Sequence, residues 1–233
     1  MNETNLHDST PFGLLNLWSQ GDIITRTVAI ILLAMSITSW VVIMTRAWGL
    51  WKIKPHSAEV ALFWQKHTWG DAMASFTGVE LNPFYNIAKA ADGVIQERIS
   101  PPTLAPIKLE FLQDDWLERS LKLELDNSVS LLQKGLAFLA STGATAPFIG
   151  LFGTVWGIYH ALMSIGASGS ASIDQVAGPI GEALIMTALG LAVAIPAVLG
   201  YNALTRMNRE LLAELKRFAD DLHSYFGTQK VES

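Results

Sequence analysis

Three long stretches without a formal charge constrain what this chain can fold into more than any other feature. They cover residues 27–45, 135–173 and 183–205. An α-helix needs about 20 apolar residues to cross the roughly 30 Å hydrocarbon core of a bilayer. Residues 166–172 are rich in Gly, Ser and Ala and are typical of a loop, which leaves a second span of about 135–165. We therefore predict an all-α membrane protein with three transmembrane helices and long cytoplasmic helical extensions.

The composition agrees with this class and excludes others. Hydrophobic residues make up 50% of the 233 residues and charged residues only 16%, whereas soluble domains carry about 25% charged residues. The chain has no cysteine, so disulfides and thiolate metal sites are excluded. A net charge of −5 without a basic run argues against a nucleic-acid partner. The N-terminus lacks a basic region before its first apolar stretch, so we expect no cleavable signal peptide.

Lys and Arg near the span ends predict the topology, because positive charges favour the cytoplasmic side. Only Arg26 precedes the first span, whereas Arg46, Lys52 and Lys54 follow it, and the tail carries Arg206, Arg209, Lys216 and Arg217. We predict a bacterial inner-membrane protein with a periplasmic N-terminus and a cytoplasmic C-terminus. The expected order is a periplasmic segment 1–22, span 23–48, a cytoplasmic helical loop 49–134, span 135–165, a periplasmic hairpin 166–181, span 182–205 and a cytoplasmic helical tail 206–233.

The two cytoplasmic parts show helical periodicity. Leu117, Leu121 and Leu125 recur every four residues in a stretch, 107–134, that contains no Gly or Pro. We expect this helix to continue without a break into the second span. Apolar residues at similar spacing predict a second cytoplasmic helix over 206–226.

Small residues share one helical face in each of the second and third spans. The faces carry Ala146, Gly150, Gly153, Thr154, Gly157 and Ala161, and Ala183, Met186, Thr187, Gly190, Ala194, Ala197 and Tyr201. Small residues let another helix backbone approach closely. Two interpretations stay open: ordinary tight helix packing, or a smooth wall around a central partner.

Glu182 stands at the start of the otherwise uncharged third span. A carboxylate inside the membrane is costly and usually faces a water path, a partner charge or a proton route. The alternative is an interfacial residue stabilised by the dipole at a helix N-terminus. Thr154 and Thr187 are weaker candidates, because a membrane Thr often bonds its own backbone one turn back. His160 is typical of a membrane-interface residue.

No pattern of soluble catalysis is recognisable in the sequence. It has no phosphate-binding loop, no His-rich metal set and no Ser-His-Asp arrangement. We predict that the chain is not an enzyme, with no catalytic residues, no metal and no cofactor.

Two runs resemble a known family. They are GATAPFIGLFGTVWGI at 143–158 and GEALIMTALGLAVAIPA at 181–197, the latter followed by Tyr201 and Asn202. Both resemble the ExbB/TolQ branch of the MotA/TolQ/ExbB proton-channel family. One departure is the order Gly178-Pro179 where the family often has Pro-Gly.

The resemblance implies a ring of five copies around two ExbD-type subunits that carry an essential proton-binding Asp. Proton-motive force would then drive TonB, which opens outer-membrane transporters for siderophores or vitamin B12. Thr154, Glu182 and Thr187 match the family's pore-lining residues. The partner helices would contact Ala146, Gly150, Gly153, Gly157, Ala183, Gly190, Ala194 and Ala197. Membrane lipid is a further expected partner. A TolQ-type subunit of the Tol-Pal envelope system and a passive channel or scaffold remain as alternatives.

Overall fold

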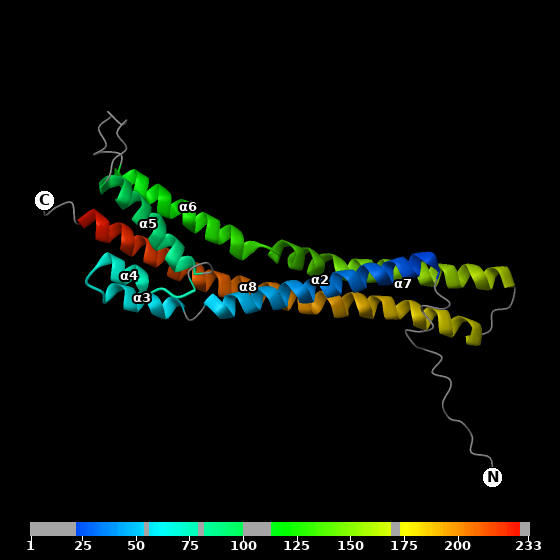
Figure 1. The fold of residues 1–233 in the computed structure, drawn as a ribbon. Coiled ribbons are helices and arrows are strands. Elements are labelled where there is room, and N and C mark those ends of the chain that lie inside the picture. The colour runs from blue at the N-terminus through cyan, green and yellow to red at the C-terminus, as the bar shows by residue number, and fades with distance from the viewer. Residues whose placement is uncertain (1–21, 54–55, 79–81, 100–112, 169–172, 229–233) are drawn as a thin grey trace, which may run out of the picture. The chain divides into compact units, whose positions relative to one another are not determined.

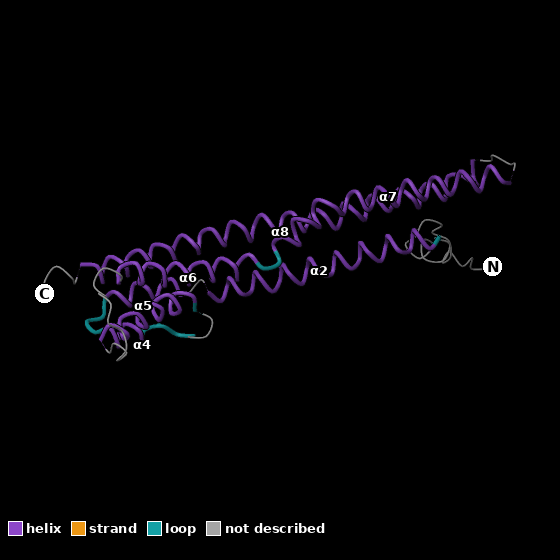
Figure 2. The backbone as a smooth tube through the Cα atoms, turned by 90° about the horizontal axis from the view of Figure 1, so that it is seen from above, coloured by secondary structure: helices purple, strands orange, loops and turns teal. Residues whose placement is uncertain are grey.

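A computed structural model describes residues 22–53, 56–78, 82–99, 113–168 and 173–228. Most of the expected N-terminal segment 1–22 and most of the glycine-rich loop 166–172 lie outside these residues. Every regular element among the described residues is helical (Figure 2). The helices are α2 (Ile23–Ile53), α3 (His56–Trp64), α4 (Trp69–Ala74), α5 (Pro83–Ile99), α6 (Gln113–Gln133), α7 (Leu136–Ser168) and α8 (Ile173–Thr228).

The helices include three stretches that are long and apolar enough to cross a membrane. They lie within Ile23–Trp64, Trp116–Met163 and Gly178–Phe226. The predicted class, an all-α protein with three such helices, is confirmed. The chain divides into two compact units. We call Met1–Met44 with Gly135–Asn202 the span unit, and Thr45–Lys134 with Ala203–Ser233 the loop–tail unit.

The span unit is a bundle of the first part of α2, α7 and the first part of α8. In it α2 runs parallel to α8 and antiparallel to α7 (Figure 1). Val28 and Leu32 of α2 pack with Ala146 of α7 and with Met186 and Val193 of α8 in a buried apolar cluster.

The outward surface of the span unit is also apolar. Phe148 on α7 is 71% exposed and Leu199 on α8 is 64% exposed. A water-soluble protein rarely exposes so large a continuous apolar surface. Within a bilayer the same surface contacts lipid or another chain without penalty, so the burial pattern supports membrane insertion of this unit.

The loop–tail unit has an aromatic core. Phe218 of α8 is 1% exposed, and its ring centroid lies 5.4 Å from that of Phe63 on α3 and 5.9 Å from that of Phe84 on α5. The ring of Trp69 on α4 makes an edge-to-face contact with the ring of Phe226, and their centroids are 5.1 Å apart. Edge-to-face pairs at these distances are favourable beyond the burial of their area, so the tail of α8 is the element around which α3, α4 and α5 pack.

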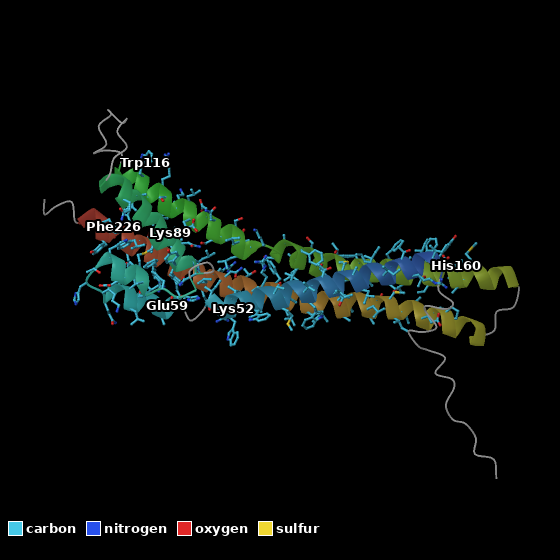
Figure 3. All side chains as sticks on the ribbon, viewed as in Figure 1. Lys52, Glu59, Lys89, Trp116, His160 and Phe226 are labelled. Atoms are coloured by element: carbon cyan, nitrogen blue, oxygen red, sulfur yellow. The ribbon has the colours of Figure 1, made fainter. Side chains whose placement is uncertain are left out.

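A polar cluster fixes the start of α5. The Asn82 side chain is fully buried, accepts hydrogen bonds from the amides of Phe84 and Tyr85, and donates to the Glu59 carboxylate at 2.9 Å. Thr77 also donates to Glu59, which is labelled on α3 in Figure 3. Gly78 has φ +61°, a backbone conformation that favours glycine, and α5 begins at Pro83, as N-terminal capping rules favour.

The expected continuous helix from the cytoplasmic loop into the second span is wrong. α6 ends at Gln133 and α7 begins at Leu136, with Gly135 at φ +84° between them. A left-handed glycine just past a helix end is a common stop signal. The C=O groups that the break leaves without helical partners accept hydrogen bonds: Arg46 donates to Leu131 O at 3.3 Å, and Asn208 donates to Leu132 O at 2.8 Å.

Candidate functional site

The small-residue faces of α7 and α8 meet each other inside the span unit. A Cβ on Gly150 would lie 2.6 Å from the Met186 carbonyl oxygen, and a Cβ on Gly190 would lie 2.7 Å from that of Ala146. Real Cβ atoms do not approach backbone so closely, so both positions require glycine. The glycines therefore set the distance between the two helices, as small residues do in membrane bundles.

The residues predicted to contact partner helices lie in or beside this seam. A Cβ on Gly153 would touch Met186 and Val28 at 3.1 Å, and one on Gly157 would meet the Ala183 Cβ at 2.9 Å. Seven of the eight predicted residues are buried within the chain, and Gly157 is half-buried. The buried ones are Ala146, Gly150, Gly153, Ala183, Gly190, Ala194 and Ala197. Ordinary helix packing thus occurs here, while contact with a partner helix stays a prediction.

Thr154 and Thr187 face each other across the seam. Their hydroxyl oxygens are 2.6 Å apart, and the Thr154 hydroxyl also lies 3.0 Å from Ala183 O and 3.2 Å from Gly150 O. A hydroxyl has one hydrogen to donate. Thr154 can therefore donate to a carbonyl while it accepts from Thr187. The bond of Thr154 to its own helix one turn back is present, but the contact with α8 adds a polar link between two membrane helices.

Glu182 lies on α8 one residue before Ala183 and is half-buried. Because α8 begins at Ile173, Glu182 stands well inside the helix. The favourable dipole effect fades within the first turn, so the interfacial alternative loses that support. Among the described residues, no hydrogen bond or ion pair of the Glu182 side chain is recorded. Five residues along a helix correspond to about 140°, so Glu182 does not share the Thr154–Thr187 contact.

One contact at the start of α2 was not predicted. The Trp156 Nε1 on α7 donates to a carboxylate oxygen of Asp22 at 3.3 Å, while the other oxygen accepts from the Ile23 amide at 2.7 Å. An Asp directly before an apolar stretch is the sequence signal of a helix N-cap and could have been noticed. His160, one turn beyond Trp156, is exposed and labelled in Figure 3.

The described residues contain no group of three or more His, Asp or Glu side chains arranged to hold a metal ion. The arrangement offers instead neutral hydroxyls and one carboxylate among apolar helices. These groups can accept, donate or exchange protons, but they include no nucleophile with an adjacent base. The fold and this site together define a helical membrane protein with three helices long and apolar enough to span a bilayer.

Comparison with known proteins refines the class. The profile of the MotA/TolQ/ExbB proton channel family matches residues 88–217. The biopolymer transport protein ExbB of Xanthomonas campestris is 40% identical over 214 residues, which cover 90% of this chain and 85% of that protein. ExbB of Neisseria meningitidis is 39% identical over 92% of this chain and 97% of that protein. The Tol-Pal system protein TolQ of Haemophilus influenzae is 31% identical, over 92% of this chain and 94% of that protein.

The chain belongs to the MotA/TolQ/ExbB proton channel family. It is therefore a multi-pass membrane protein of a transport family and not an enzyme. The resemblance stated from the two sequence runs is confirmed, and the ExbB relatives are more similar to the chain than the TolQ relatives.

Proposed function

We propose that this chain is the ExbB-type subunit of an inner-membrane proton channel that energises TonB-dependent uptake through outer-membrane transporters. The observation that carries the proposal is the similarity to ExbB proteins, at 40% identity over nine-tenths of the chain, against 31% for TolQ. The paired hydroxyls and the half-buried carboxylate supply polar groups in the membrane unit, as a proton-driven machine requires.

The functional complex is a ring of five chains around two ExbD-type helices, and it transmits energy to a TonB-type protein. The exposed apolar surface of the span unit supports association with other membrane helices. Since most of the small residues are buried against each other, partner helices touch the seam at its half-buried residues, which are Gly157, Glu182 at one edge and Thr187 at the opposite edge. The buried glycines then act indirectly, by holding α7 and α8 close together.

Glu182 influences the protonation of the Asp that the ExbD-type partner carries. A carboxylate well inside α8 without a recorded partner among the described residues is costly in a membrane unless water, a proton or a partner group neutralises it. Thr154 and Thr187 contribute neutral donors and acceptors along the same route.

Complementation separates this function from the Tol-Pal alternative. The chain, expressed together with its own ExbD-type partner, is introduced into two bacterial strains, one lacking ExbB and one lacking TolQ. We expect restored siderophore-dependent growth under iron limitation in the first strain, and no restored detergent resistance in the second. Rescue of the TolQ-deficient strain alone, at equal protein level in the membrane, would assign the chain to the Tol-Pal system.

A further inference from the structure

A groove of about 410 Å³ runs between α2 and α8 of the span unit. Its apolar walls include Ala29, Ile30 and Leu33 from α2 and Met186, Leu189 and Val193 from α8. Ile30 and Leu33 are 51% and 61% exposed, so the groove is open along the surface of the bundle. An occupant that replaces water here must be predominantly apolar.

The length of the groove matches one leaflet of a bilayer. Its lining extends along α2 from Thr25 to Ser36, which corresponds to about 16 Å at 1.5 Å per residue. Half of the roughly 30 Å hydrocarbon core is about 15 Å. An acyl chain of a membrane lipid that starts at the interface would therefore end near the far end of the groove.

A cation lies at one end of the groove, and the predicted span 23–48 leads us to expect a membrane surface near that end. Arg26 lines the groove in the first turn of α2, beside Thr25, and is half-buried. A guanidinium carries five N–H donors in a planar fork, which suits a phosphate and leaves donors for protein contacts. Basic pockets between membrane helices bind lipid headgroups for this reason.

We propose that this groove is a binding site for one phospholipid, with its phosphate on Arg26 and one acyl chain along α2 and α8. The proposal does not depend on which side of the membrane holds the N-terminus. The lipid covers the exposed side of the α2–α8 contact. It bridges α2 and α8, the helix that carries Glu182 and Thr187.

A second groove serves as an internal control. It lies between α2 and α7, has a volume of about 450 Å³, and is lined by apolar residues such as Ile31 and Phe152 together with Thr27 and Thr145. No charged residue lines it. An acyl chain can enter this groove, but nothing there selects a phosphate.

The test counts lipids that stay with the full-length chain and its copurifying partners. Complexes are exchanged into nanodiscs that contain phosphatidylglycerol or, in a parallel arm, an excess of uncharged diacylglycerol, and are released for native mass spectrometry. We expect the wild type to retain about one more phosphatidylglycerol per chain than Arg26→Gln or Ala192→Phe, which fills the groove. Arg26→Lys should retain an intermediate amount, diacylglycerol should not be retained, and Thr145→Phe in the control groove should match the wild type.

Equal phosphatidylglycerol retention in the wild type and in Arg26→Gln would overturn the proposal. So would a lower oligomer mass in Ala192→Phe with an unchanged lipid count, because a neighbouring copy of the chain would then occupy the groove. Circular dichroism identifies any variant that fails to fold. If Ala192→Phe is lost in this way, the Arg26→Gln count decides the outcome.

Discussion

At the scale of single residues, the polar groups of the span unit differ in what their loss should cost. The Thr154 hydroxyl already accepts a hydrogen bond from Thr187 and donates to one of two nearby backbone carbonyls. Glu182 has no recorded partner among the described residues, although it is half-buried. A hydroxyl can be replaced by water more easily than a charge can. The carboxylate is therefore the residue on which proton-dependent function should depend most.

Glu182→Gln keeps the shape of the side chain and removes its charge. We expect it to abolish siderophore-dependent growth under iron limitation without lowering membrane insertion or oligomer formation. Thr154→Ala and Thr187→Ala should reduce growth less, since each removes one interhelical hydrogen bond of about 1 kcal/mol. Thr154→Ser, which keeps the hydroxyl, is the control. Normal growth of the Glu182→Gln strain at normal protein level would leave only an interfacial role for this residue.

At the scale of elements, the close backbone contact between α7 and α8 is the feature that tolerates the least increase in side-chain size. A Cβ on Gly190 would lie 2.7 Å from Ala146 O and 3.1 Å from the Gly150 Cα, and neither backbone atom can move away without shifting a helix. A Cβ on Gly93, in the middle of α5, would meet nothing within 4 Å. The two positions differ in packing and not in helix propensity.

Gly190→Ala should therefore lower the stability of the chain by about 1–3 kcal/mol, as overpacking does. Gly93→Ala should leave it unchanged or raise it by up to about 1 kcal/mol, because alanine is the better helix former. Thermal unfolding in detergent, followed by circular dichroism, measures both. A Gly190→Ala protein as stable as the wild type would mean that α7 and α8 do not touch as closely as described.

The break between α6 and α7 depends on donors from other helices. Asn208 is 5% exposed and donates to Leu132 O at 2.8 Å. Asn208→Ala leaves that carbonyl without this donor, and an unsatisfied buried polar group costs about 1–3 kcal/mol.

We expect Asn208→Ala to lower the unfolding temperature and to increase amide hydrogen exchange around 131–134. Asn127→Ala is the matched control, because Asn127 is exposed and bonds only to Glu124 on its own helix. Equal exchange in both variants would argue that the Asn208 bond does not hold the break.

At the scale of the whole molecule, the orientation in the membrane and the oligomeric state remain predictions from the sequence. The asymmetry of Lys and Arg predicts that residue 170 lies in the periplasm and residue 216 in the cytoplasm. The chain has no cysteine, so single cysteines can be introduced without background.

In intact spheroplasts, an impermeant thiol reagent should label Ser170→Cys and not Lys216→Cys, and both should react after lysis. Labelling of position 216 before lysis would reverse the topology. The purified chain, at 25.4 kDa, should give a native mass about five times as large, as the predicted ring of five copies requires.

The sequence by itself determined the class, the three membrane-spanning helices and the family. Membrane insertion depends on contiguous apolar length, which is visible along the chain, and the runs 143–158 and 181–197 carry the family motif within single helices. Glu182 could be selected because charged residues are rare in such helices, whereas Thr154 and Thr187 were singled out by the resemblance to the family. The break at Gly135 was missed, although a glycine after a polar helix is a known stop signal.

Only the tertiary structure decided which surfaces meet. From the helical wheel, Gly150 and Gly190 could face a partner or each other, and the structure places them against each other. Thr154 and Thr187 proved to be hydrogen-bonded to each other. The physical reason is that a helical face follows from spacing within one element, whereas its contact depends on the register and approach of residues more than thirty positions apart. Backbone contact and hydrogen bonding set that register, and neither is encoded in local periodicity.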